Sequence, residues 1–105
     1  MGIQWTPLTT ANADGGWLEV PRFADRSVQV SGIFGTGGSV SIQGSNEPGA
    51  TNAVTLTDQA GVALAITTPS LKIVLQNSTF IRPLVTAGDG TTSLTITLTA
   101  KGDDL

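Results

Sequence analysis

The segment from Ser93 to Ala100 alternates strictly between apolar and hydroxyl-bearing residues. Its apolar positions are Leu94, Ile96, Leu98 and Ala100, and its polar positions are Ser93, Thr95, Thr97 and Thr99. Because successive side chains of a β-strand point to opposite faces, this repeat of two predicts a strand with one buried and one exposed face. The same alternation recurs along most of the chain, so the sequence predicts an all-β protein.

Turn signals divide the rest of the chain into short strands. Apolar residues at strand spacing predict strands at Trp17–Val20, Ser27–Phe34, Ser39–Gln43, Ala53–Thr57, Val62–Ile66, Leu71–Gln76 and Thr79–Val85. Short strands at this spacing, with no amphipathic helix between them, predict a single β-sandwich. A jelly roll and an immunoglobulin-like Greek key both fit this pattern, and the jelly roll is the preferred expectation.

Three of these segments carry more specific expectations. Asp58-Gln59-Ala60-Gly61 predicts a hairpin turn in which Gly61 has a positive φ. The apolar run Leu71–Gln76 predicts a strand that is buried on both faces. Pro83 has no N–H to donate, so its strand is expected to end there or to lie at the edge of a sheet.

The N-terminal region differs from the rest of the chain. Residues 1–16 hold Trp5, Pro7 and Gly15 without sustained periodicity, which predicts an extended arm. The predicted organisation is therefore an arm at 1–16, a sandwich domain at 17–101 and a C-terminal tail at 102–105. Trp5 is expected to insert into a pocket, and its own subunit and a partner are equally good candidates for that pocket.

Composition argues against several classes of function. The net charge of −3 with only five basic residues argues against binding nucleic acid, and no apolar run is long enough to span a membrane. The chain has no His and no Cys, so it lacks the groups of a Ser-His-Asp relay, a thiolate nucleophile or an imidazole metal ligand. We therefore expect a protein that is not an enzyme and that has no metal and no cofactor.

Acidic side chains are the remaining candidates for catalysis. A pair of carboxylates could serve glycoside hydrolysis, and the available residues are Asp14, Glu19, Asp25, Glu47, Asp58 and Asp89. Asp58 and Asp89 lie in turn sequences, where an aspartate is favoured because its side chain caps the turn. Asp89 alone is also far from the six to eight oxygen ligands that Ca²⁺ takes.

Residues with interface character are the candidate functional residues. Trp and Arg are enriched at protein interfaces, and the segment around Trp5 has little local means of holding itself down. The predicted contact residues are Trp5, Pro7, Leu8, Trp17, Arg22, Arg26 and Arg82. The alternatives are a core position for Trp17 and a solvated strand end for each Arg. The Thr face of Ser93–Ala100 is a further expected contact surface, with plain solvent exposure as its alternative.

Residues 27–101 resemble the small all-β virion proteins of tailed bacteriophages. The resemblance lies in a strand ending in Gly-Ser before a loop (GSVSIQGSNEPG), a Leu-Thr-Asp hairpin (TLTDQAGVAL), an Arg-Pro strand end and a Thr-rich final strand (FIRPLVTAGDGTTSLTITLTAK). In particular, it resembles the decoration or cement proteins, which bind the outside of the capsid. It implies a jelly-roll-like sandwich that forms a dimer or trimer on the lattice of the major capsid protein, without catalysis.

This resemblance implies a protein that is made in the host cytoplasm and located on the virion surface. Two other functions remain open from the sequence. Tail and baseplate proteins share the resemblance, and the two Trp residues on a β-sandwich also suit a carbohydrate-binding module. The absence of Tyr argues against the carbohydrate-binding module, because sugar platforms usually need several exposed aromatic rings.

Overall fold

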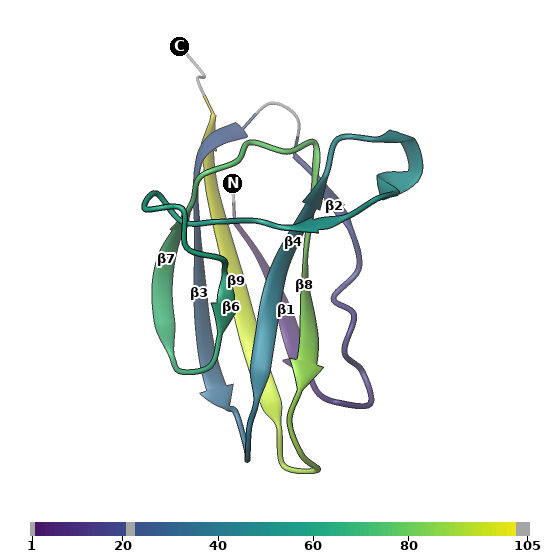
Figure 1. The fold of residues 1–105 in the computed structure, drawn as a ribbon, viewed down its shortest axis with the longest axis vertical. Helices are drawn as coiled ribbons and strands as arrows, with labels where there is room; N and C mark the ends of the chain where they lie inside the picture. Colours follow the sequence, from purple (N-terminus) through teal and green to yellow (C-terminus); the bar gives the residue numbers. More distant parts are fainter. Residues whose placement is uncertain (1, 21–22, 103–105) are drawn as a thin grey trace.

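Two antiparallel β-sheets packed face to face make up the protein (Figure 1). The computed structural model describes residues 2–20 and 23–102. Its strands are β1 (Gly2–Leu8), β2 (Leu18–Glu19), β3 (Phe23–Ile33), β4 (Ser39–Ser45), β5 (Val54–Thr55), β6 (Ala65–Ile66), β7 (Ser70–Val74), β8 (Phe80–Ala87) and β9 (Ser93–Gly102), with a 3₁₀ turn η1 (Pro48–Ala50) after β4. The predicted all-β sandwich is confirmed.

The two sheets are built from different parts of the chain. Sheet A has the order β1-β9-β3-β7, and sheet B has the order β2-β8-β4-β5, with β6 also paired to β4. Every strand pairing is antiparallel. Strands β5 and β6 follow each other along the same edge of β4, because Gln43 and Gly44 pair with β5 whereas Val40 and Ser41 pair with β6.

The core lies between the sheets and follows the alternation in the sequence. In β9, Leu94, Ile96, Leu98 and Ala100 are each 0 % exposed, as the repeat of two predicts. Sheet B contributes buried residues of the same kind to the other side of the core, among them Val40, Ile42, Ile81 and Val85. Removing this apolar surface from water is the main force that holds the sheets together.

The N-terminal segment is a strand of sheet A, so the prediction of an arm at 1–16, separate from a domain beginning at residue 17, is wrong. Residues of β1 pair with β9 from Gly2↔Thr99 to Leu8↔Leu94. Ile3 and Trp5 pack against the core, and Leu8 is buried within it. The register shifts between Trp5 and Leu8, which moves the inward positions from odd to even numbers. This irregularity interrupts the repeat of two by which a strand is recognised in a sequence.

The strand predicted to be buried on both faces is exposed instead. β7 forms an edge of sheet A, and Val74 is its only fully buried residue. Leu71, Ile73 and the following Leu75 are 67 %, 49 % and 53 % exposed. A continuous apolar run does not say whether a second layer covers its outer face. Here no other described element covers it.

Pro83 neither ends its strand nor lies at a sheet edge, so that prediction is wrong. β8 continues to Ala87 and lies between β2 and β4. The Pro83 carbonyl accepts the N–H of Gly15 at 3.1 Å, so the missing N–H faces the segment around Gly15 rather than β4. Among the described residues, only the two-residue β2 and an isolated bridge at Asp14 pair with β8 on that side, so no regular ladder is interrupted.

The predicted hairpin turn at Asp58–Gly61 is confirmed. The Asp58 N–H donates to the carbonyl of Val62 at 2.9 Å, and Gly61 has a φ of 82°. The turn forms the tip of a loop between β5 and β6, and the N–H of Leu64 closes the base of this loop on the carbonyl of Leu56. Residues 57–63 are therefore an insertion in the edge that runs along β4.

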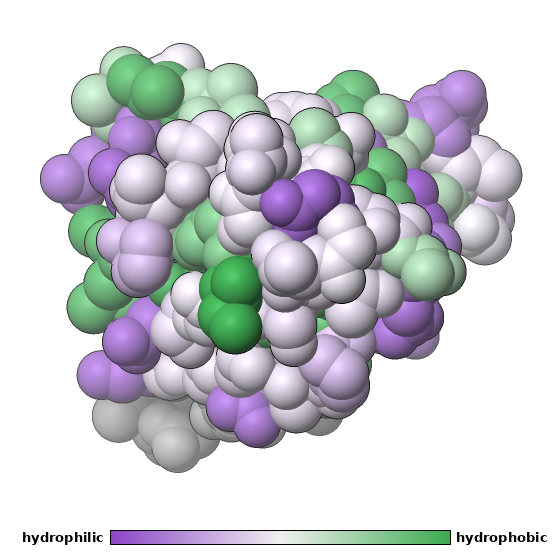
Figure 2. Space-filling view, turned by 90° about the horizontal axis from the view of Figure 1, so that it is seen from below, coloured by the Kyte–Doolittle hydropathy of each residue, from purple (hydrophilic) through white to green (hydrophobic). Residues whose placement is uncertain are grey.

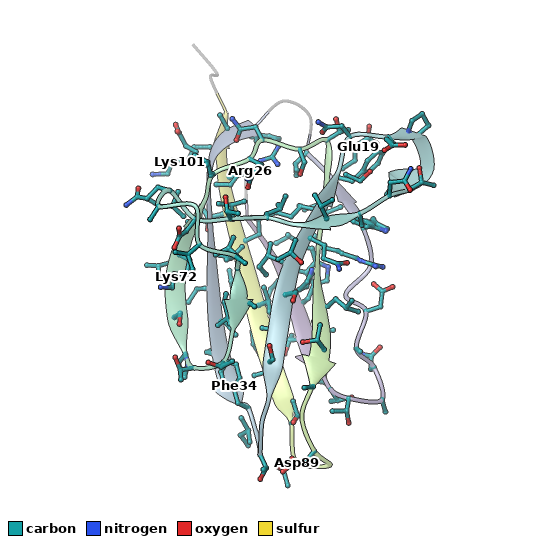
Figure 3. All side chains as sticks on the ribbon, in the orientation of Figure 1. Glu19, Arg26, Phe34, Lys72, Asp89 and Lys101 are labelled. Atoms are coloured by element: carbon teal, nitrogen blue, oxygen red, sulfur yellow. The ribbon has the colours of Figure 1, made fainter. Side chains whose placement is uncertain are left out.

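A buried arginine joins three main-chain segments at one end of the sandwich. Arg26 is 1 % exposed and donates to the carbonyl oxygens of Phe23, Ser78 and Val20 at 2.9, 2.6 and 2.6 Å. Burial lowers the pKa of its guanidinium, which still stays charged because arginine titrates so far above neutral pH. Figure 3 places Arg26 near the upper end of the molecule.

We expect Arg26→Met to lower the free energy of unfolding by about 3 kcal/mol or more, because each buried acceptor left without a donor costs about 1–3 kcal/mol. Urea denaturation measures the change. Lys101→Met, at an exposed position of β9, is the control and should leave the midpoint nearly unchanged. An R26M midpoint equal to that of the wild type would contradict the structural role of Arg26.

We expect Leu8→Ala to lower the free energy of unfolding by about 3 kcal/mol, because truncating a buried leucine leaves a cavity. Gln4→Ala, at an exposed position of the same strand, should change it by less than about 0.5 kcal/mol. Thermal and urea unfolding compare the two variants. Equal, small effects would mean that β1 detaches from sheet A in solution.

Candidate functional site

The seven residues predicted to contact a partner lie in very different surroundings. Leu8 and Arg26 are buried, so both are core residues and their prediction as contact residues is wrong. Pro7 is exposed, on the edge strand β1. Arg22 lies outside the described residues. The prediction selected these residues by their type and by their place in the N-terminal segment or at strand ends. Which of them point into the core is decided by the fold.

The side chain of Trp5 lies against its own subunit. It is half-buried, it pairs with Ile96 of β9, and it packs against the core. A Cβ placed on Gly15 would lie 2.9 Å from the Trp5 ring and 2.6 Å from Pro83, so only glycine fits between them. These contacts favour the intramolecular of the two environments expected for Trp5.

Trp17 and Arg82 form a cluster on sheet B. The Arg82 guanidinium lies 4.6 Å from the centre of the Trp17 ring, a cation–π contact. It also forms an ion pair with Asp14 at 2.7 Å and donates to Gln43 at 3.0 Å. Trp17 is half-buried beneath this arginine, so the alternative expectation of a core position is wrong, and its role as a contact residue stays a prediction. The polar groups of the cluster satisfy one another, which explains its geometry without a ligand.

The two aspartates predicted to cap turns do so. An Asp58 carboxylate oxygen accepts the N–H groups of Ala60 and Val62 at 2.9 and 3.0 Å. The Asp89 carboxylate accepts the hydroxyl of Thr91 at 2.6 Å and the N–H groups of Thr91 and Thr36 at 2.8 and 2.9 Å. These bonds, that of the Thr91 hydroxyl above all, hold the pKa of the Asp89 carboxyl well below its ordinary value of 3.8.

The outer side of sheet A is a surface of uncharged polar residues, which we call the hydroxyl face. Its strands β1, β3 and β9 present nine uncharged polar residues there: Gln4, Thr6, Ser27, Gln29, Ser31, Ser93, Thr95, Thr97 and Thr99. They form rows across the sheet, in which Gln29 and Gln4 both lie beside Thr97. Gln4 donates to the Thr97 hydroxyl at 3.2 Å, and the hydroxyls of Thr6 and Thr95 lie 2.7 Å apart.

An apolar border flanks the hydroxyl face along β7. Leu71 pairs with Gln29, and Ile73 pairs with Ser27. These two side chains therefore extend the cross-strand rows of the hydroxyl face onto β7. Figure 2, seen from the lower end of Figure 1, shows apolar residues along the side on which Figure 1 places β7. Sequence reasoning missed this border because it took the run as core. The single charged residue in it, Lys72, was the available signal, because lysine is typical of edge strands.

Two hollows flank the open side of β7. One, of about 190 Å³, lies between β6 and β7, and the other, of about 210 Å³, lies between β7 and the hairpin turn at Asp58. Asp58 and Lys72 line both hollows. A third hollow of about 290 Å³, next to β5 and the segment 76–78, has a mostly apolar lining that includes Val54 and Leu56.

Comparisons with known proteins identify no relative of this chain: no family model, curated protein or solved structure matches it significantly. Within residues 2–20 and 23–102, no three His, Cys, Asp or Glu side chains are grouped so that they could hold a metal ion. The same residues contain no helix of the length and hydropathy needed to cross a membrane.

The lowered pKa of Asp89 predicts a pH-dependent contribution to stability. The contribution is fully present above pH 3.8 and is lost as the pH falls through the lower folded-state value. We expect Asp89→Asn to lower the melting temperature at pH 7, and the difference from the wild type to shrink as the pH falls below 3.8. Circular dichroism melts between pH 7 and 2 measure this difference.

Thr91→Val removes the hydroxyl donor but keeps the main-chain N–H, and it should weaken the same pH dependence. A difference between wild type and D89N that stays constant down to pH 2 would contradict this role of Asp89.

Proposed function

We propose that this protein is a non-enzymatic structural protein of a tailed-bacteriophage virion, which binds the outer surface of the capsid as a decoration protein. Its partner is the lattice of the major capsid protein, and it acts as a dimer or trimer. The hydroxyl face with its apolar border is the observation that carries the proposal.

The composition of this surface suits contact with another protein. Its nine polar positions carry no charge, and the nearest charged residue along β9 is Lys101, at the end of the face. Depletion of charged residues is typical of interface cores, because charged groups are the most expensive to remove from water. Leu71 and Ile73 add exposed apolar area to the same rows.

The size of this surface favours binding to a repetitive partner. Three rows about 6.7 Å apart across four strands about 4.8 Å apart cover roughly 400 Å². A stable interface between two proteins buries about 800 Å² on each partner, so a single contact through this face is weak. On a shell, oligomers of the protein would make many such contacts at once, and their combined avidity is much larger.

The resemblance of residues 27–101 to phage decoration proteins supports the same proposal. The environment of the tryptophans does not favour the carbohydrate-binding alternative. Trp5 packs against the core, and Arg82 lies against the ring of Trp17. A location in the tail remains an outcome that microscopy distinguishes from the capsid.

Gln29→Glu tests the role of the hydroxyl face, because it adds one charge with almost no change in shape. Gln29 is exposed in the middle of the face, beside Leu71 and Thr97. We expect Q29E to weaken binding to undecorated capsids of the encoding phage about tenfold or more, because a charge must then be desolvated at the contact. Co-sedimentation with the capsids measures binding.

Asn77→Asp is the matched control, since it makes the same amide-to-acid change at an exposed loop position outside sheet A. It should bind like the wild type.

Electron microscopy of virions that carry a labelled copy of the protein shows whether it lies on the shell or on the tail. A tail location, or equal capsid binding by Q29E and wild type, would refute the proposal in this form.

A further inference from the structure

The free edge of sheet A offers main-chain groups to a further strand. β3 lies on one side of β7, and no described strand pairs with its other side. Just beyond β7, the N–H of Leu75 donates to the carbonyl of Thr57 at 2.9 Å, on the side away from β3. Main-chain groups of alternate residues in a strand point to the same side, so Leu71 and Ile73 direct their N–H and C=O groups to the open edge.

Lys72 places one positive charge in the middle of this edge. It is exposed, and its register with the buried Val28 puts it on the opposite side of β7 from Leu71 and Ile73. Among residues 2–20 and 23–102, Arg82 and Asp14 form an ion pair, and Lys72 takes no part in it. Asp58 lines the same hollows, but one of its carboxylate oxygens is engaged by two N–H groups of its own turn. Figure 3 shows Lys72 on β7 at the side of the sandwich.

A second copy of β7 does not fit this edge in any of three antiparallel registers, each defined by the residue that would lie opposite itself in the other copy. With Lys72 opposite Lys72, two ammonium groups would face each other directly, which is destabilising. With Ile73 opposite Ile73, the added strand would need the N–H of Leu75, which already donates to the carbonyl of Thr57. With Leu71 opposite Leu71, Ile73 would lie opposite Pro69, which has no N–H to donate.

We propose that the open edge of β7 binds, by strand addition, an extended segment of another protein that places a carboxylate opposite Lys72 and apolar residues opposite Leu71 and Ile73. Opposite charges across two strands attract, and the apolar pairs extend the border of the hydroxyl face. The inference deepens the proposed function, because it states what kind of segment the virion partner supplies.

Two synthetic peptides provide the probes for this edge. One copies residues 69–76 with Glu in place of Lys72, and the other keeps the original sequence. We expect NMR titration of the ¹⁵N-labelled protein to shift the amide signals of Leu71 and Ile73, with binding of the Glu peptide about tenfold tighter than that of the Lys peptide. Tenfold corresponds to about 1.4 kcal/mol, the size expected for exchanging a repulsive for an attractive cross-strand pair.

Three protein variants make the test specific. Lys72→Glu should reverse the preference, so that the Lys peptide binds more tightly than the Glu peptide. Ile73→Pro should abolish binding of both peptides, since it removes an N–H from the open edge and proline is tolerated in edge strands. Lys101→Glu makes the same charge change elsewhere in sheet A and should leave the preference as in the wild type.

Equal binding of the two peptides, or the same preference in K72E as in the wild type, would overturn the proposal. So would dimerisation of the unmodified protein that I73P abolishes, because a second copy would then be the occupant. The peptide experiments need no capsid. Capsid binding that fails while the peptides bind would refute only the proposed function, and the reverse result would refute only the strand addition.

Discussion

The burial of one side of β9 is the constraint on which the rest of the structure depends. β9 lies between β1 and β3, and its inward residues Leu94, Ile96 and Leu98 have no exposed surface. A slip of one residue in either pairing would turn these side chains to solvent and bring threonines into the core. The register of sheet A is therefore strongly specified. This register also determines the hydroxyl face. Because side chains alternate along β9, each residue next to a buried one points to the outer side of sheet A.

The two sides of the sandwich are closed in different ways. On the side of β1, the ring of Trp5 packs near Gly15 and Pro83 and helps to cover the gap between the sheets. On the side of β7, hollows remain between the strand edge and the elements β6 and the hairpin turn. The surface features that suit a partner, namely exposed apolar residues, an unpaired strand edge and one lysine, gather on this more open side.

The sequence predicted the local chemistry of the turns better than the environment of the candidate contact residues. Asp58 and Asp89 cap their own turns, because the groups they bind lie within a few residues or in an adjacent turn. The environment of Arg26 could not be predicted in this way. Its acceptors include Ser78, 52 positions away, and an arginine at a strand end looks the same in a sequence whether it is solvated or buried.

The sequence by itself determined that the chain is all-β, where most strands lie and which side of β9 is buried. A repeat of two is a property of one strand, and burial of one face follows directly from it. Only the tertiary structure decided which strands are neighbours and which lie at edges. Gly2–Leu8 joins sheet A through an irregular register, and Ser70–Val74 remains an exposed edge. The physical reason is that strand pairing depends on main-chain hydrogen bonds, which every residue except proline can donate, so the side-chain pattern does not record the partner.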